Sequence, residues 1–322
     1  MSVYLKELTS ALVEEPDVRV DIFTRSQDPA CSKVKDVSPR IRVIQVKGGP
    51  EKPVDRRTLY RYVPEFSARM EEHLLRESVE YDLIHSHYWL SGLSGLRIHR
   101  KRGWPLVHTY HTLDFMKKKA GDGQDHSKRP VSERLLAEYS DLIISPTDAE
   151  KQSLVAEYDL SPERVAVVYP GVNRRLFYRT PGSAVLRDPD SEQEACVFLY
   201  VGRIEPVKGL MDVVLAFDLM RQEAPSLFQK ARLAVIGGGS REELRSNPEF
   251  LRIQKTVKEN GLSERVEFLG SIPQAQLRRY YSSADALVVP SLYESFGLVV
   301  IEALACGTPV IVSRIGEMAT IV

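Results

Sequence analysis

Short runs of β-branched and other apolar residues recur along the first half of the chain, and helix-like stretches separate most of them. The runs lie at residues 18–24, 41–46, 83–86, 105–109, 142–145 and 165–168. Residues 1–12 already have the pattern of an amphipathic helix, with no strand pattern before them. Alternation of this kind predicts an α/β fold with parallel, doubly wound sheets.

A polar stretch at residues 179–194, which contains Pro and Gly, has neither a helix nor a strand period. The alternation then restarts, with apolar runs at residues 196–201, 231–236, 266–269, 286–289 and 309–312. A length of 322 residues suits two domains. We therefore predict two Rossmann-like domains, residues 1–180 and 195–322, joined by a linker at 181–194. Two such domains facing one another leave a cleft lined by the carboxyl ends of both sheets.

Composition narrows the choice of partners. Lys and Arg number 44 and Asp and Glu number 44, so there is no overall charge to attract nucleic acid or an anionic membrane. The three cysteines are far apart and lack metal-ligand spacing, and no apolar run is long enough to span a bilayer. We expect a soluble cytoplasmic protein that binds no nucleic acid and is not inserted in a membrane. Any anionic ligand should be bound by a local group of positive charges.

The sharpest chemical pattern is the segment 293–312, in which Glu294 and Glu302 are separated by seven residues. The pattern predicts a strand ending near residue 289, a loop carrying Glu294, and a helix beginning near Gly297. A helix start offers unpaired N–H groups and a positive dipole end to a phosphate, and a glycine there allows close approach. Glu294 is placed to accept hydrogen bonds from sugar hydroxyls, and Glu302 from a ribose.

Upstream, the segment 200–210 places Arg203 and Lys208 in a strand-to-helix turn. Two cations there can straddle a diphosphate and offset the charge that it gains as a leaving group. Taken singly, each of these four residues is as well explained by a solvated surface charge. Their joint occurrence at two strand-to-helix turns favours the functional interpretation.

The sequences GRIEPVKGL (202–210) and ESFGLVVIEALACGTPVI (294–311) resemble those of the retaining glycosyltransferases of family 4 with the two-domain GT-B fold, of the sucrose-phosphate synthase and MshA type. The resemblance implies a hexosyl or N-acetylhexosaminyl transfer from a UDP-sugar, or another NDP-sugar, to a hydroxyl of a phosphorylated sugar or cyclitol. It implies no metal and no cofactor. It also implies a set of donor-binding residues: Arg203, Lys208, Glu294, Phe296, Gly297, Leu298 and Glu302.

Histidines gather in two segments that follow predicted strands, 82–92 and 108–112. We expect His85, His87 and His108 to be structural. The same family resemblance places His111 beside the donor sugar, so His111 joins Arg203, Lys208 and Glu294 as a predicted catalytic residue. It further implies four acceptor-phosphate ligands: Arg56, Tyr88, Thr112 and Arg129.

The chain departs from the family pattern in three places. Arg56 stands where relatives usually have lysine, so its neighbour Arg57 is an alternative ligand. The strand and glycine pair that family members carry before the first helix are absent, as is their C-terminal end. We therefore expect a fragment with weak or no turnover.

Three weaker sequence patterns do not by themselves indicate a functional site. The glycines at 237–239 favour a tight turn and a ligand loop about equally. Asp188 and Asp190 mimic a metal-binding DxD but are interpreted as a turn, and the lysines at 117–119 as a solvated run.

Two other functions stay open from the sequence, namely the same fold acting on a lipid or polysaccharide acceptor, and a non-catalytic nucleotide-sugar-binding module. No carboxylate aligns with a nucleophile role, so the resemblance implies a front-face reaction. Donor base, sugar, acceptor and oligomeric state are not encoded in these motifs.

Overall fold

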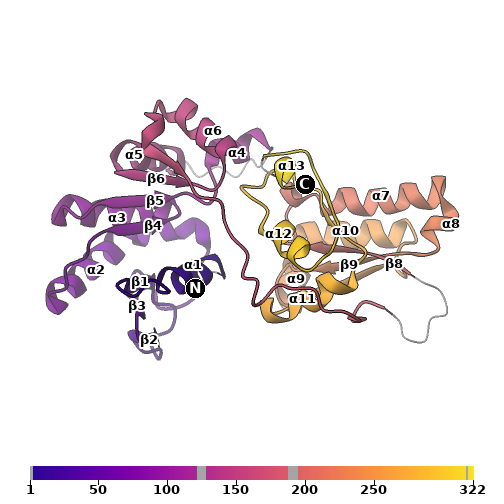
Figure 1. The fold of residues 1–322 in the computed structure, drawn as a ribbon, viewed down its shortest axis with the longest axis horizontal. Coiled ribbons are helices and arrows are strands. Elements are labelled where there is room, and N and C mark those ends of the chain that lie inside the picture. Colours follow the sequence, from indigo (N-terminus) through magenta and orange to yellow (C-terminus); the bar gives the residue numbers. More distant parts are fainter. Residues whose placement is uncertain (1–2, 122–127, 188–194, 317) are drawn as a thin grey trace. The chain divides into compact units, whose positions relative to one another are not determined.

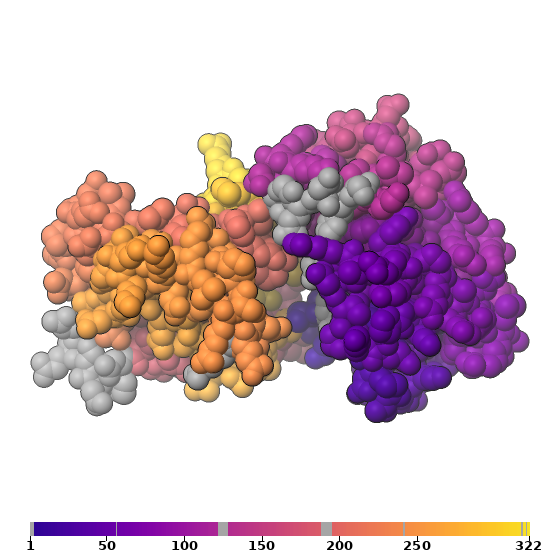
Figure 2. All heavy atoms as spheres, turned by 180° about the vertical axis from the view of Figure 1, so that it is seen from behind, coloured from indigo at the N-terminus to yellow at the C-terminus, as the bar shows by residue number. Residues whose placement is uncertain are grey.

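The computed structural model describes residues 3–121, 128–187, 195–316 and 318–322. The chain divides into two units, coloured along the sequence in Figures 1 and 2. The N-terminal unit comprises Met1–Asp114, Asp125–Ser145 and Lys151–Val167. The C-terminal unit comprises Phe115–Gln124, Pro146–Glu150 and Val168–Val322.

The described strands of the N-terminal unit form two sheets (Figure 1). One has the order β1-β3-β2, built from β1 (Val20–Arg25), β2 (Val34–Ser38) and β3 (Ile41–Val46). The other has the order β4-β5-β6-β7, built from β4 (Ile84–His87), β5 (Leu106–Thr109), β6 (Leu142–Ser145) and β7 (Val165–Val167). All neighbouring strands are parallel except β2 and β3.

Helices connect these strands as the alternating pattern predicts. They are α1 (Val3–Leu12), η1 (Arg56–Tyr62), α2 (Val63–Glu77), α3 (Trp89–Arg102), α4 (Asp114–Lys119), α5 (Arg129–Tyr139), α6 (Asp148–Tyr158) and η2 (Pro162–Arg164). One apolar core brings residues of both sheets together with α2 and α3, because Ile44 of β3, Met70 of α2 and Ile98 of α3 pack in the same cluster as Ile84 of β4. The two sheets are thus held by shared side chains.

The C-terminal unit has one parallel five-stranded sheet with the order β10-β9-β8-β11-β12. Its strands are β8 (Cys196–Val201), β9 (Ala231–Ile236), β10 (Val266–Gly270), β11 (Ala286–Val289) and β12 (Val310–Val312). Its helices are η3 (Pro206–Lys208), α7 (Leu210–Glu223), α8 (Pro225–Phe228), α9 (Arg241–Ser246), α10 (Pro248–Glu259), α11 (Gln274–Ser283), α12 (Leu298–Ala305) and α13 (Met318–Ile321).

Local sequence signals set several of these helix boundaries. Ser240 and Glu243 form a reciprocal capping box at the start of α9. The Asn247 side chain accepts from two backbone N–H groups of α10, whose first residue is Pro248. On either side of the sheet, separate apolar clusters centred on Val214 and on Val300 close the core.

Each apolar run of the sequence coincides with a strand, to within two residues at either end. Strand β2 was not anticipated, because it lies antiparallel at a sheet edge and most of its side chains are exposed, which leaves no apolar pattern. The parallel α/β fold with two sheet-containing units is confirmed.

The exact domain limits stay a prediction. The stretch 168–187 belongs with the C-terminal unit, since Phe177 is buried in its core and Arg187 pairs with Asp285. Part of the proposed linker, residues 188–194, lies outside the described residues.

Candidate active site

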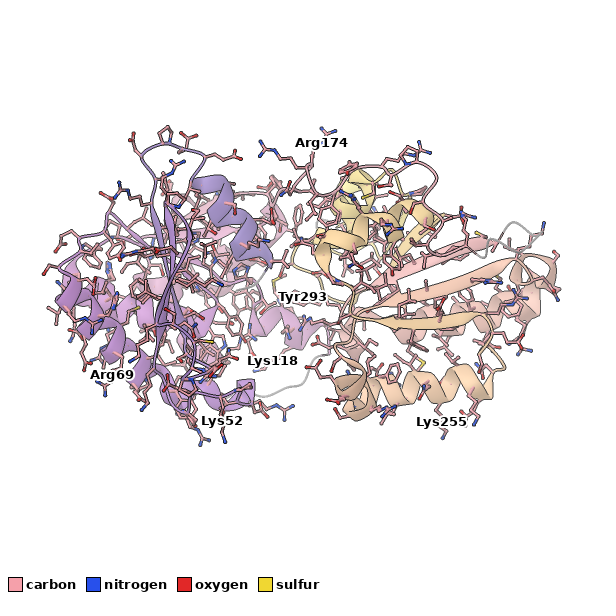
Figure 3. All side chains as sticks on the ribbon, turned by 90° about the horizontal axis from the view of Figure 1, so that it is seen from below. Lys52, Arg69, Lys118, Arg174, Lys255 and Tyr293 are labelled. Carbon is pink, nitrogen blue, oxygen red and sulfur yellow. The ribbon has the colours of Figure 1, made fainter. Side chains whose placement is uncertain are left out.

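The loop after β11 brings two of the predicted donor residues into contact. The Lys208 Nζ lies 2.6 Å from the Glu294 Oε2, and both side chains are largely buried. The same ammonium lies 3.5 Å from the backbone carbonyl of Tyr293, which is labelled in Figure 3. A cation and a carboxylate from two different strand-to-helix turns therefore share one position at the carboxyl edge of the sheet.

Close backbone packing explains why these two turns meet. The Leu292 N–H donates to the Val207 carbonyl over 2.8 Å, which ties the β11 loop to η3. Gly209 has φ +68°, and a Cβ there would lie 2.2 Å from the carbonyl oxygen of Pro290. Only glycine satisfies both the backbone angle and this close approach, so Gly209 allows the two turns to lie this near to each other.

Helix α12 begins where the sequence predicted, with Gly297 as its N-cap at φ +88° and Leu298 as its first residue. Among the described residues, no side chain forms a capping hydrogen bond at Gly297, the end of α12 where the N-terminal N–H groups are directed. Phe296, just before them, is buried. This geometry suits a phosphate at the helix start, although the residue roles stay predictions.

Arg203 stands apart from the Lys208–Glu294 pair. Its guanidinium pairs with Glu205 over 2.7 Å, and its side chain is 52% exposed. The backbone below it is fixed, because the Tyr200 hydroxyl donates to the Arg203 carbonyl over 2.9 Å. The structure therefore gives Arg203 a half-exposed guanidinium, separate from the Lys208–Glu294 pair, on a backbone anchored by Tyr200.

Glu302 lies in the second turn of α12 and is mostly buried. Burial raises the pKa of its carboxyl to about 7, although hydrogen bonds from Tyr281 and Gln274 act in the opposite direction. The Tyr281 hydroxyl donates to the Glu302 Oε2 over 2.8 Å. Tyr281 and Gln274 carry no recognisable motif, so sequence reasoning missed both.

Three of the four predicted acceptor ligands converge in the N-terminal unit. The Arg129 Nη2 donates to both the carbonyl (2.6 Å) and the Oγ1 (3.0 Å) of Thr112. The guanidinium carbon of Arg129 lies 5.2 Å from the centre of the Tyr88 ring. The side chain of Arg56, at the start of η1, lies outside the described residues.

A buried carboxylate that the sequence analysis missed holds Arg129 in place. The Glu133 Oε1 accepts from the Arg129 Nε over 2.6 Å, while its Oε2 accepts from the Asp114 N–H and the Tyr158 hydroxyl. Glu133 follows Arg129 by four residues on α5, so i,i+4 spacing on the predicted helix was the available signal. The pair fixes the orientation of the Arg129 guanidinium, whose side chain is 4% exposed.

The histidines form a cluster at the carboxyl ends of β4 and β5. The His87 Nδ1 and the His111 Nε2 lie 3.0 Å apart, and the His85 and His87 ring centres 4.1 Å apart. Burial, with smaller contributions from neighbouring histidines, lowers the pKa of His87 to about 2 and that of His85 to about 4. Burial alone lowers the pKa of His111 to about 4. The imidazoles are therefore neutral at physiological pH and interact as hydrogen-bonding groups.

Two of the predicted site residues have an unusual backbone. Among the described residues other than glycine, φ is positive at Ser78, Tyr88, His111 and Asp159. Ser78 ends helix α2, and Asp159 directly follows α6. Tyr88 and His111 instead sit at strand-to-helix junctions, with φ +71° and +63°. Strained backbone at these two positions points to a functional demand on their side chains.

The structure describes some of the weaker sequence patterns and not others. Gly237, Gly238 and Gly239 all have positive φ, and a Cβ on Gly237 would lie 1.9 Å from the Gly202 carbonyl oxygen, so glycine is needed for a tight turn against the Arg203 loop. Asp188 and Asp190 lie outside the described residues. In the described part of the chain, no three His, Cys, Asp or Glu side chains are grouped as metal ligands. No described helix is long and apolar enough to cross a bilayer.

Comparison with known proteins identifies the family. Residues 1–176 match the model described as Glycosyltransferase Family 4, and residues 186–322 match the model of Glycosyl transferases group 1. The chain belongs to the group 1/family 4 glycosyltransferases. It is accordingly a glycosyltransferase, which confirms the family inferred from the two motifs.

Similar family members are known by name. The D-inositol 3-phosphate glycosyltransferase 2 of Catenulispora acidiphila is 37% identical over 328 residues, covering 100% of this chain and 75% of that protein. The D-inositol 3-phosphate glycosyltransferase of Thermobifida fusca is 35% identical over 331 residues, with 100% and 74% coverage.

Solved structures share the fold of this family member. Sucrose-phosphate synthase from Thermosynechococcus elongatus matches with a TM-score of 0.86 and 33% identity over 99% of this chain and 76% of that one. Anabaena Alr3699/HepE, solved in complex with UDP and glucose, matches with a TM-score of 0.67 and 20% identity over 87% of this chain and 69% of that one. The latter likeness supports the GT-B fold alone.

Proposed function

We propose that this glycosyltransferase transfers a hexosyl or N-acetylhexosaminyl group from a UDP-sugar, or another NDP-sugar, to a hydroxyl of a phosphorylated sugar or cyclitol, with retention of configuration. The observation that carries the acceptor class is the meeting of three predicted acceptor ligands, since Arg129 donates to Thr112 and lies against the ring of Tyr88. A planar guanidinium with hydroxyl-bearing neighbours suits a phosphate monoester. The family members named for inositol phosphate and sucrose phosphate point to the same class.

On the donor side, Lys208 and Arg203 supply the cations that a departing diphosphate needs. Lys208 is already oriented by Glu294, so little reorganisation remains when the leaving group gains charge. Glu294 has a second carboxylate oxygen available for sugar hydroxyls. The start of α12, at Gly297 and Leu298, offers backbone N–H groups to the phosphates.

The proposed reaction needs no base from the protein. His111 is held neutral by burial and bonded to His87, so it orients or stabilises the donor sugar by hydrogen bonding. The departing diphosphate oxygen takes the proton of the incoming hydroxyl, on the same face of the sugar. We further propose that the reaction needs no metal or cofactor and takes place in the cytoplasm.

The chain spans 75% of the length of the Catenulispora acidiphila relative, so the test uses a protein extended at both ends to that length. It measures UDP release with UDP-glucose and UDP-N-acetylglucosamine, each offered with hexose phosphates, inositol phosphates and their unphosphorylated counterparts. We expect release with a phosphorylated acceptor and at least a hundredfold lower kcat/KM for its unphosphorylated form, since a bidentate charged contact is lost. NMR of the product decides the anomeric configuration. No release with any acceptor, or equal use of both forms, contradicts the proposal.

A further inference from the structure

The contact between α11 and α12 contains a buried tyrosine bonded to a predicted donor ligand. Tyr281 of α11 is fully buried, and its hydroxyl donates to the Glu302 Oε2 over 2.8 Å. The backbone of Tyr281 is anchored in turn, because the Thr308 Oγ1 donates to the Tyr281 carbonyl over 2.6 Å. Neither the side chain nor the backbone of Tyr281 can move without breaking one of these hydrogen bonds.

This anchoring restricts the carboxylate of Glu302. One carboxylate oxygen is fixed by the Tyr281 hydroxyl, and the Gln274 amide from the start of α11 adds a second hydrogen bond. A carboxylate held from one side by two donors presents its remaining lone pairs in one direction. A freely rotating glutamate on a helix surface would lose that orientation at a cost in side-chain entropy on binding.

The charge environment makes the hydrogen bond consequential. In the described part of the chain, the groups acting on Glu302 are the Tyr281 hydroxyl and the Gln274 amide from α11, and neither is a cation. Cys306, the C-cap residue of α12, is affected by Glu302 and by the more distant cation of Arg278 on α11. Burial raises the pKa of Tyr281 and Cys306, so both remain protonated and neutral. The ionised form of Glu302 therefore depends on neutral donors.

We propose that Tyr281 is a positioning residue of the donor site, whose hydroxyl holds the Glu302 carboxylate aimed at the ribose hydroxyls of the nucleotide. The inference rests on the proposed function, because it assumes a nucleoside diphosphate donor. It assigns to a core tyrosine a part in nucleotide affinity. Tyr281 itself touches no ligand in this scheme, and acts through Glu302.

The test compares Tyr281→Phe with the wild-type protein by calorimetric titration with UDP between pH 5.5 and 8.5. Removing the hydroxyl withdraws a donor from the carboxylate, so the midpoint of the pH dependence of UDP binding shifts upward by about one unit. At pH 7 we expect about a tenfold loss of UDP affinity, and at pH 8.5 a loss of about threefold or less. Titration of UDP itself is common to both proteins and cancels in their ratio.

A second ligand and two further variants isolate the effect. The 2′,3′-dideoxy analogue of UDP lacks the ribose hydroxyls, so its affinity should be equal for wild type and Tyr281→Phe. Tyr280→Phe is the matched control, because Tyr280 lies next in the chain and packs on the same core. Glu302→Gln should bind UDP weakly, with no contribution of this carboxyl to the pH dependence. Thermal unfolding establishes that each variant folds.

The possible results distinguish the positioning role of Tyr281 from the proposed function. UDP binding by Tyr281→Phe with an unshifted midpoint, or an equal loss for the dideoxy analogue, overturns the positioning role and leaves the proposed function intact. If the wild-type protein binds no UDP at any pH, the proposed donor fails, and the inference fails with it.

Discussion

Burial shifts the pKa of the histidines in the N-terminal unit and the pKa of Glu302 in the C-terminal unit in opposite directions. All seven histidines of the chain lie between residues 73 and 126, and none lies in the remaining 196 residues of the C-terminal side. In the N-terminal unit, burial keeps imidazoles neutral by lowering the pKa of His85 and His111 to about 4. In the C-terminal unit, burial raises the pKa of Glu302 to about 7. Burial disfavours the charged form of the histidines and of Glu302. A low pH, which protonates the histidines, therefore destabilises the N-terminal unit, and a high pH, which ionises Glu302, destabilises the C-terminal unit.

The largest expected effect is the acid sensitivity of the N-terminal unit. A histidine whose pKa is lowered on folding contributes stability that is present above its unfolded pKa, near 6.5, and lost as the pH falls toward 4. Each of His85 and His111 should cost about 2 kcal/mol between pH 7.5 and pH 5, or about 4 kcal/mol together. Amide hydrogen exchange, corrected for the intrinsic exchange rate at each pH, measures the protection of each unit separately. Equal protection factors in β4 and β5 at both pH values would contradict it.

Next in size is the loss of turnover on breaking the Lys208–Glu294 pair. Lys208→Met removes a cation placed at the leaving diphosphate, so kcat should fall by about a thousandfold. Lys255→Met is the control, since Lys255 is an exposed lysine of α10 that pairs with Glu259 and is labelled in Figure 3. A Lys208→Met enzyme with more than a tenth of wild-type kcat would exclude this role.

On the N-terminal side, Arg129→Met should reduce kcat/KM for a phosphorylated acceptor by about a hundredfold and leave the unphosphorylated acceptor unaffected. Loss of the guanidinium also leaves Glu133 without its cation, so the double variant with Glu133→Gln distinguishes binding from folding. Arg134→Met, on the exposed face of the same helix, is the matched control. An equal loss for both acceptors would show that Arg129 is structural.

The smallest expected effect is the opposite pH response of the C-terminal unit. A carboxyl whose pKa is raised on folding contributes stability that is present below its unfolded pKa and lost as the pH rises through about 7. Glu302→Gln should therefore gain about 2 kcal/mol on the wild type between pH 5 and pH 7.5. Urea unfolding at the two pH values measures the difference. A constant difference between the proteins would contradict the buried-carboxyl interpretation.

The sequence predicted the fold well because parallel strands buried on both faces leave long apolar runs, as in residues 196–201 and 231–236. It predicted which donor residues lie near the β11 loop, because Gly209 and Gly297 mark turns that need glycine. It did not predict Tyr281 or His87 as partners of site residues. Their hydrogen bonds join residues at least 21 positions apart, and no local pattern records which core side chain meets which.

The sequence likewise did not predict the protonation state or the surroundings of several candidate site residues. The family resemblance predicts His111 beside the donor sugar, but the lowering of its pKa to about 4 by burial follows only from the structure. Likewise, Lys208 and Arg203 were interpreted as one diphosphate clamp. The structure gives them different surroundings, a fixed and mostly buried lysine against a half-exposed arginine.

The positive φ angles of Tyr88 and His111 have a consequence for engineering the enzyme. Replacing either residue with glycine relieves a backbone conformation that L side chains rarely adopt, a strain of about 1 kcal/mol, but also removes the contact with His87 or with Arg129. The same change deletes a side chain that we propose binds the acceptor or the donor sugar. A glycine at either position would therefore separate the demand of the backbone from the demand of the proposed site, since it meets the first and removes the second.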